Sequence, residues 1–330
     1  MKRLLLMLVL LVMTLGGGLS YYALTPLPLA QAPRDFTLKP GSGLKSAARQ
    51  MREAGVLNLE LPFVLLARAM GQAEQLKAGG YRLDQPVTPL RLLEMLRNGE
   101  FSQAQLSVIE GWSFRQLRAA LDASPDVAHD SVGLSEAEIL RRIGAEGAQA
   151  EGFFFPDTYL FSRGESDLAV LKQAYQAMAR VMAEQWEVRA DGLPFESPYQ
   201  ALILASIVEK ETGAPQDRAL IAAVFENRLR IGRPLQTDPS VIYGLGARFD
   251  GNLRRADLVA DTPYNTYTRR GLTPTPIALP GAAALQAVLH PAETKALYFV
   301  ARGDGSSEFS ETLEQHNRAV ARYQLKAGKK

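Results

Sequence analysis

The chain has 330 residues, of which 47% are hydrophobic and 22% are charged, a composition typical of a folded protein rather than a disordered one. The formal net charge of +2 gives no electrostatic reason to expect a nucleic-acid partner. Cysteine is absent and the three histidines lie far apart in the sequence, which disfavours disulfides, a cysteine nucleophile and a metal site. We therefore expect no metal and no cofactor, and a chain long enough for two or three structural units.

The first 24 residues predict a membrane anchor. Lys2 and Arg3 precede an apolar run, and no further charged residue occurs before Arg34. About 20 apolar residues span a bilayer, and paired basic residues favour a cytoplasmic N-terminus. We therefore expect a single-pass transmembrane helix in the inner (cytoplasmic) membrane, with the rest of the chain periplasmic or extracytoplasmic. A cleaved signal peptide is the alternative, because residues 30–32 resemble a cleavage site, although they lie far beyond the apolar run.

A proline-rich linker over residues 25–35 leads into a small lobe over residues 36–100. The pattern predicts a strand, two helices and a returning strand, at residues 36–38, at 44–54, after Pro62 and at 81–83. This β-α-α-β order resembles a LysM domain, a glycan-binding module, whereas a small α+β lobe without a ligand is the alternative. A further helix is expected over residues 88–99, with Thr88 as N-cap, Pro89 in the first position and Gly99 beyond the end.

Residues 101–330 are expected to form a larger mixed α+β catalytic domain, so that the whole chain belongs to the α+β class. The segment 151–161 is dense in aromatic residues and is either part of the core or a surface on which sugars stack. A polar loop that leads into a short apolar piece is expected over residues 233–246, and a long irregular loop, rich in proline, threonine and tyrosine, over residues 261–281. Long ordered loops of this kind are often functional. The other expected elements are helices at 167–189, 198–212, 216–232, 282–290 and 309–325, and a strand at 297–301.

Glu209 lies near the end of the predicted helix over residues 198–212, seven residues after Leu202 and within about 20° of it around the axis. It therefore faces the same side as the apolar stripe. Desolvation and the negative end of the helix dipole both raise the pKa of a carboxyl in this position, as a general acid requires. The alternative is an ordinary helix-end charge in a salt bridge with Arg228 or Arg230.

Glu211 points about 200° away from Glu209 around the same helix. We expect Glu211 to be a solvated helix-end charge. The two carboxyls cannot form the pair of a retaining glycosidase, which requires a separation of about 5 Å. Farther along the chain Gln236, Thr237 and Asp238 form a polar cluster that fits a simple turn as well as a substrate contact.

Several long motifs resemble the YceG-like family, and they occur in the order that the family has. They are ASIVEKET (205–212), VFENRLRIGRPLQTDPSVIYGLG (224–246), TPYNTYTRRGL (262–272) and LYFVARGDG…FSETLEQHN (297–317), preceded by EGFFFPDTY (151–159). The N-terminal anchor and the LysM-like lobe resemble the family as well, so the likeness covers nearly the whole chain.

The resemblance implies a membrane-anchored lytic murein transglycosylase, which cuts nascent peptidoglycan glycan strands internally and so ends their elongation. It places the single catalytic glutamate, in a lysozyme-like helical site, at Glu209. That residue would act first as an acid and then as a base, leaving a 1,6-anhydro-N-acetylmuramyl end. The implied partners are peptidoglycan strands, the inner membrane and cell-wall synthases such as penicillin-binding proteins.

The remaining candidate site residues are expected to bind glycan or to orient Glu209. They are Gln236, Thr237, Asp238, Tyr264, Asn265, Tyr267 and Asn227. The sequence departs from the family pattern at Leu279, where family members often have asparagine, and at Ser306 and Ser307, where they carry a histidine. Two other functions fit the sequence: a membrane-tethered glycan-binding scaffold for synthases, and an inverting hydrolase with a second carboxylate facing Glu209.

Overall fold

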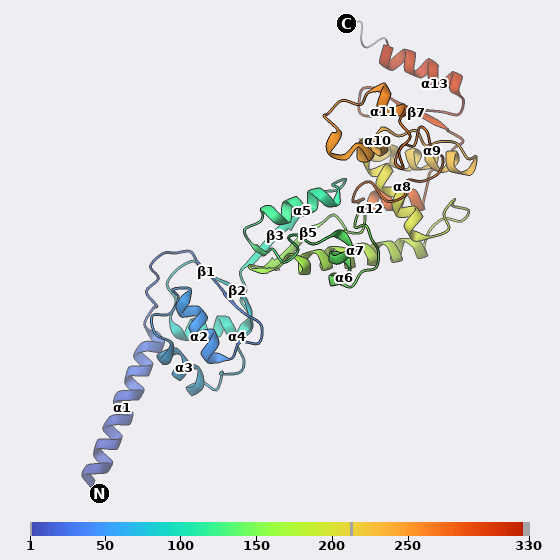
Figure 1. The fold of residues 1–330 in the computed structure, drawn as a ribbon. Coiled ribbons are helices and arrows are strands. Elements are labelled where there is room, and N and C mark those ends of the chain that lie inside the picture. Colours follow the sequence, from blue (N-terminus) through green and yellow to red (C-terminus); the bar gives the residue numbers. More distant parts are fainter. Residues whose placement is uncertain (1, 212–213, 326–330) are drawn as a thin grey trace. The chain divides into compact units, whose positions relative to one another are not determined.

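The computed structural model describes residues 2–211 and 214–325 and has a mixed α+β fold, as predicted (Figure 1). The chain divides into two compact units. Unit 1 contains Met1–Gln105, Ser124–Asp130 and Leu160–Asp167, and unit 2 contains Leu106–Ala123, Ser131–Tyr159 and Leu168–Lys330. The functional boundaries expected from the sequence, at residues 24, 35 and 100, stay predictions.

Unit 1 begins with the helix α1 (Lys2–Leu24), which covers the predicted apolar segment. Within the part of the chain that the structure describes, no helix combines the length and the apolar character needed to cross a membrane. After α1, the backbone N–H of Leu27 donates a hydrogen bond to the carbonyl oxygen of Val87 at 2.8 Å, and the Leu27 side chain is buried in the lobe.

The β-α-α-β order predicted for the small lobe is confirmed. It consists of β1 (Arg34–Leu38), α2 (Leu44–Glu53), α3 (Glu60–Ala69) and β2 (Gly79–Leu83). The two strands pair antiparallel, with Phe36 opposite Tyr81 and their rings stacked at 5.3 Å between centroids. Aromatic cross-strand pairs of this kind stabilise a two-stranded sheet, which needs helices packed on it for independent stability.

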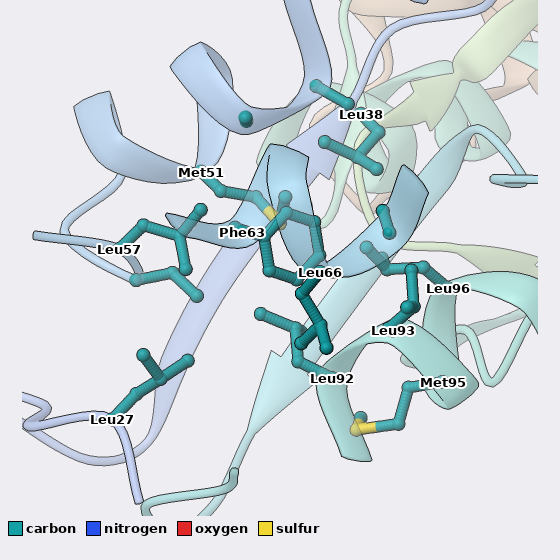
Figure 2. Close-up of a cluster of buried hydrophobic side chains, with 14 of the residues drawn as sticks. Leu27, Leu38, Met51, Leu57, Phe63, Leu66, Leu92, Leu93, Met95 and Leu96 are labelled. Carbon is teal, nitrogen blue, oxygen red and sulfur yellow. The ribbon is translucent and has the colours of Figure 1, made fainter. Parts of the chain in front are cut away.

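Large apolar side chains from both helices, and from the following helix α4 (Pro89–Asn98), meet in one core beside these strands. Figure 2 shows Met51, Phe63 and Leu66 pointing into the same space as leucines of α4. The ends of α4 agree with the sequence prediction. The Thr88 hydroxyl accepts a hydrogen bond from the Arg91 N–H, and Gly99 has the left-handed φ of 71° that ends a helix.

Two short strand pairs complete the β-structure of this part of the chain. The strand β3 (Gln103–Ser107) pairs with β5 (Thr158–Ser162), and β4 (Val127–Ala128) pairs in parallel with β6 (Glu165–Ser166). These strands lie where the chain repeatedly changes from one unit to the other.

Unit 2 is mainly helical, and three of its helices form its centre. The helix α8 (Pro198–Glu211) packs against α9 (Arg218–Arg230) and α12 (Ala282–Leu289), which also pack against each other. All eight residues from Ala201 to Val208 are buried. The helix α8 is therefore buried on all sides, and its apolar character is not confined to one stripe.

The other helices of unit 2 surround this centre. They are α5 (Phe114–Ala123), α6 (Glu136–Ile143), α7 (Asp167–Glu187), α10 (Asp238–Leu245), α11 (Arg255–Val259) and α13 (Leu313–Val320), with the short turns η1 (Pro215–Asp217), η2 (Gly246–Arg248) and η3 (Ala321–Leu325). The long segment 261–281 contains no helix or strand, as predicted.

Two predictions of secondary structure were wrong. The expected polar loop over 233–246 contains the helix α10, in which a proline occupies the first turn without disrupting it. The expected helix over 309–325 begins later, because residues Ser307–Ser310 form the strand β8, which pairs antiparallel with β7 (Tyr298–Ala301). The hydrogen bonds to β7 override the local helical pattern of these residues.

Candidate functional site

The Glu209 side chain lies at the C-terminal end of α8 and is partly buried. Its Oε2 accepts a hydrogen bond of 3.0 Å from the backbone N–H of Gly281, the residue that caps the N-terminus of α12. Burial raises the pKa of the Glu209 carboxyl above its ordinary value, and the hydrogen bond from Gly281 opposes this shift. The negative charge of Glu110 raises the pKa further, while Arg218 and Lys210 lower it.

Ser206 fastens the loop that carries Gly281 to α8, one turn before Glu209. Its hydroxyl donates to the carbonyl oxygen of Ile203 at 2.7 Å and accepts from the N–H of Ile277 at 2.9 Å. Ser206 is fully buried, so this link is protected from water. The backbone N–H that holds Glu209 is therefore fixed to the same helix as Glu209 itself.

The alternative of a salt bridge for Glu209 does not agree with the structure. Arg228 donates from Nε to the carbonyl oxygen of Leu297 at 2.7 Å and from Nη1 to that of Leu235 at 2.5 Å. Arg230 pairs with Glu226 at 3.1 Å. Both guanidinium groups are thus engaged with other partners.

The prediction of Glu211 as a solvated charge was wrong. Its Oε1 accepts a hydrogen bond of 2.5 Å from the Thr237 hydroxyl, and burial raises the pKa of its carboxyl. The Asp238 charge raises this pKa as well, whereas Arg228 lowers it. The physical reason is that α8 is covered on every side, so that a residue on the face opposite Glu209 also meets protein rather than water.

The structure brings Gln236, Thr237 and Asp238 against the 261–281 loop. The N–H of Gln236 donates to the carbonyl oxygen of Thr266 at 3.0 Å, and the N–H of Thr237 to the Thr266 hydroxyl at 3.0 Å. Asp238 accepts a hydrogen bond of 2.5 Å from the hydroxyl of Tyr267. Gln236 has a φ of 52° and is the one non-glycine residue with positive φ in the described segments. Backbone strain of this kind is frequent at functional sites.

Two of the candidate residues donate hydrogen bonds from their side-chain amides to backbone carbonyl oxygens. The Asn265 amide is buried and donates to the carbonyl oxygens of Asp257, Leu258 and Ala260 at 3.1, 3.1 and 2.7 Å. The Asn227 amide donates to the carbonyl oxygens of Thr294 and Ala296 at 2.9 and 3.1 Å. These hydrogen bonds hold the neighbouring backbone in place, and a role of either amide in glycan binding stays a prediction.

A cleft of about 880 Å³ lies next to Glu209. Its lining includes Lys210, which follows Glu209 in the chain, together with Gly111 and Ile277. An added Cβ at Gly111 would lie 3.8 Å from Cγ of Glu209, and Ile277 is the residue bound by Ser206. Aromatic and charged side chains complete the lining: Tyr243, Phe249, Tyr264, Arg115, Glu136, Glu151 and Lys210. Of the sequence candidates, Tyr264 faces this cleft; its ring packs edge-to-face on Tyr243 at 4.9 Å, and its hydroxyl bonds Thr275 at 2.9 Å.

Glu151 is a cleft residue that sequence reasoning missed. Its Oε1 accepts the N–H of Phe114 at 2.9 Å, at the N-terminus of α5, while burial raises the pKa of its carboxyl to about 7. One glycine separates Glu151 from three successive phenylalanines, and a lone acid beside an apolar run is the same signal that identified Glu209. In that run, Phe154 is buried and stacks on Phe114 at 5.0 Å, which agrees with the core interpretation of the aromatic segment.

Within the described residues, no group of three or more histidine, cysteine, aspartate or glutamate side chains is arranged to hold a metal ion. The Leu279 side chain, at a position where the family pattern has asparagine, is fully buried. Its backbone N–H donates to the carbonyl oxygen of Trp112 at 2.7 Å, and its carbonyl oxygen accepts from Gly111 at 2.9 Å. Leu279 therefore supports the site through its main chain.

The fold and site define an α+β protein in which the partly buried carboxyl of Glu209 lies beside a cleft that combines aromatic and charged groups. The sequence model of the YceG-like family matches residues 36–322, so the chain belongs to this family. It is 31% identical over 311 residues to the endolytic murein transglycosylase of Bacillus subtilis, a match that covers 88% of this chain and 84% of the relative.

Two further similarities agree with this assignment. An endolytic murein transglycosylase of Streptococcus pneumoniae is 27% identical over 348 residues, covering 93% of this chain and 62% of the longer relative. The crystal structure of a YceG-like protein from Listeria monocytogenes superposes with a TM-score of 0.53 at 26% identity, and the match covers 86% of this chain and 97% of that one.

Proposed function

We propose that this chain is an endolytic murein transglycosylase that cuts nascent peptidoglycan glycan strands, with Glu209 as its general acid and then its base. The observation that carries the proposal is the setting of Glu209, where burial beside a cleft raises the pKa of the carboxyl. A general acid must be protonated near neutral pH, and this setting favours the protonated form. The relatives named endolytic murein transglycosylase, matched over most of this chain, support the same substrate.

The reaction requires one carboxyl group. The protonated Glu209 gives its proton to the glycosidic oxygen as the bond to C1 of N-acetylmuramic acid breaks, and the departing sugar leaves with a free 4-hydroxyl. The 6-hydroxyl of the same muramic residue then attacks its C1, which carries oxocarbenium character, and transfers its proton to the Glu209 carboxylate. The product is a 1,6-anhydro end, and no water is consumed. Holding the internal hydroxyl close to C1 replaces a second catalytic group by proximity.

The cleft provides groups that suit a peptidoglycan strand. Sugar rings present apolar faces that pack on aromatic side chains, and Tyr243, Phe249 and Tyr264 line the cleft. Its charged residues have both signs, Arg115 and Lys210 with Glu136 and Glu151, which fits stem peptides that carry carboxylates and amines. We include Gln236, Thr237, Asp238 and Tyr267 as groups that orient this wall of the site, on the basis of the hydrogen bonds that join them to the 261–281 loop.

The decisive experiment compares Glu209→Gln with the unchanged chain on purified glycan strands, with products identified by mass spectrometry. The variant keeps the shape of the side chain but cannot donate or accept a proton as a carboxyl does. We expect the rate of cleavage to fall by about 10²–10⁴-fold, the usual contribution of a general acid–base group. Glu146→Gln, at an exposed position of the same unit, is the matched control and should cleave normally. Retained cleavage in Glu209→Gln would refute the catalytic role and favour a glycan-binding scaffold.

An inverting hydrolase is the second candidate, because the structure places another acid, Glu110, close enough to Glu209 to influence its titration. A hydrolase would need this second carboxylate to activate water. The same mass spectra separate the two reactions, since hydrolysis yields reducing N-acetylmuramic ends and transglycosylation yields 1,6-anhydro ends.

We further propose that the enzyme works outside the cytoplasm, held at the inner membrane by residues 1–24, near cell-wall synthases that supply nascent strands. The absence of charge between Arg3 and Arg34 supports this location.

We also propose that the β-α-α-β lobe is LysM-like and binds glycan. A hollow of about 580 Å³, lined by Gly41–Ser46, Arg68 and Glu74, supports this role. Titration of the protein with N-acetylglucosamine oligomers, followed by NMR, should shift the signals of this hollow; unchanged signals would refute binding by the lobe.

A further inference from the structure

The segment that precedes α5 is joined to the loop that precedes α12 by two main-chain hydrogen bonds. The N–H of Gly111 donates to the carbonyl oxygen of Leu279 at 2.9 Å, and the N–H of Leu279 to that of Trp112 at 2.7 Å. The side chain of Lys210 adds a third bond, from Nζ to the carbonyl oxygen of Gly111 at 3.1 Å. Residues 110–112 and 279–281 therefore form one rigid support directly beside Glu209.

This support places two carboxylates against the same glycine. The N–H of Gly281 donates to Oε2 of Glu209, and a Cβ added to Gly281 would overlap the carboxylate oxygen Oε1 of Glu110. Gly281 has a φ of −80°, which any residue adopts, so the backbone conformation does not require glycine here. The requirement comes from the space that the Glu110 carboxylate occupies.

Three charged side chains act on Glu209 from the elements that pack around it. Glu110 comes from the segment before α5, Lys210 from α8 itself and Arg218 from the start of α9. Glu110 is the one negative charge among them, and it opposes the two cations. Without Glu110 the two cations would act unopposed and would lower the pKa of Glu209, against the effect of burial, which makes proton donation in the first step less favourable.

We propose that Glu110, held against Gly281, is a positioning residue whose negative charge adds to the effect of burial in favouring the protonated form of Glu209. This inference rests on the proposed function of Glu209. Glu110 is exposed. Because water screens an exposed charge, the effect is moderate and is greatest on the alkaline side of the activity profile.

The first test measures protonation directly and does not depend on turnover. Protein carrying ¹³C-labelled glutamate is titrated by NMR, and the Glu209 carboxyl signal is assigned by its loss in Glu209→Gln. In Glu110→Gln the negative charge is gone, so the titration midpoint of Glu209 should move to lower pH. The control Asp122→Asn removes the same charge from an exposed position in α5 and should leave the midpoint unchanged.

The second test uses the glycine. The side chain added in Gly281→Ala displaces the Glu110 carboxylate without removing a charge, and the displaced atom is the end of a flexible side chain. We expect this variant to shift the Glu209 midpoint in the same direction as Glu110→Gln. The double variant should show no further shift, because both changes remove the same interaction.

The pH dependence of cleavage supplies the functional readout. In Glu110→Gln, the ratio of kcat/KM at pH 8 to that at pH 5.5 should fall about three- to tenfold, as the loss of one nearby charge implies. A variant that was merely damaged would lose activity equally at both pH values. An unchanged Glu209 midpoint in Glu110→Gln overturns the proposal, whether or not the protein cleaves glycan. Reducing ends that disappear in this variant would overturn it too, because they would make Glu110 the base of a hydrolase. Absence of cleavage by the unchanged chain would count against the proposed function alone.

Discussion

At the level of single residues, four glutamates of unit 2 have carboxyls whose pKa is raised chiefly by burial. They are Glu151, Glu209, Glu211 and Glu226. Each accepts a hydrogen bond that partly offsets this burial, from Phe114, Gly281, Thr237 and Arg230 respectively. Ionisation of these groups therefore lowers the free energy of unfolding, and both stability and activity should depend on pH between the acidic range and neutrality.

Glu151, which lines the cleft, gives a prediction for stability. The pKa of its carboxyl is about 7 in the folded protein, against an ordinary value of 4.5. The unfolded chain therefore ionises first as pH rises, so the contribution of Glu151 to folding is present below pH 4.5 and is lost by pH 7. Relative to Glu151→Gln, the free energy of unfolding should fall by about 3 kcal/mol across this range.

Urea unfolding of both proteins at pH 4.5, 6 and 7.5 would measure this difference. Glutamine can still accept the Phe114 N–H, so the variant should stay folded throughout. Parallel pH profiles for the two proteins would contradict the assignment of Glu151 as a buried carboxyl that resists ionisation. Glu146→Gln, at an exposed position of the same unit, serves as the control.

The sequence identified Glu209 correctly as a residue facing protein at the end of its helix, although its catalytic role stays a prediction. It failed for Glu211, because periodicity assumes one buried face and α8 has none exposed along residues 201–208. The role of Glu110 depends on Gly281, which lies 171 residues away in the chain. A contact over such a distance leaves no mark in the local pattern.

At the level of elements, α8 and the 261–281 loop act together through Ser206. The hydroxyl of Ser206 satisfies the buried N–H of Ile277, and the loop then presents Gly281 to Glu209. Removal of this hydroxyl leaves a buried donor without a partner, which costs about 1–3 kcal/mol.

We therefore expect Ser206→Ala to be destabilised by that amount and to lose cleavage activity beyond the loss of folded protein. Hydrogen exchange should show faster opening at Ile277 and Gly281. Ser135→Ala is the control, since Ser135 caps α6 through the N–H of Glu138 at 3.3 Å, and its loss should cost about 1 kcal/mol without affecting cleavage. Normal exchange at Gly281 in Ser206→Ala would show that the loop is held by other contacts.

Elements with local signals were predicted well, and elements that depend on distant partners were not. The helix α4 carries its cap, its first-turn proline and its final glycine in the sequence, and each appears in the structure as expected. The strand β8 reads SEFS, a short polar segment that becomes a strand only because β7 pairs with it. The helix α10 was hidden because its proline and its polar first turn resemble a loop.

At the level of the whole molecule, the proposed anchor makes a prediction about location. The full chain should remain in the membrane fraction after alkaline extraction, and protease added to spheroplasts should degrade units 1 and 2. Leu11→Arg places a charge in the centre of the apolar run, at a cost of about 2.5–3.5 kcal/mol for insertion, and should weaken membrane retention. Leu11→Ile is the matched control and should behave like the unchanged chain. Complete extraction of the unchanged chain would refute anchoring by residues 1–24.

The two units alternate along the chain, and this limits where the chain can be divided into parts that fold on their own. Unit 1 draws on three separate stretches, and the last two are enclosed in the sequence of unit 2. The backbone of Arg163, in the third stretch, lies so close to Gly80 that a Cβ added to Gly80 would overlap the Arg163 carbonyl oxygen. Cutting the chain after residue 100 would therefore separate most of unit 1 from its other two stretches, Ser124–Asp130 and Leu160–Asp167, and would not yield a complete unit. Recombination between relatives can therefore exchange unit 1 as a folded part only if all three of its stretches are exchanged at the same time.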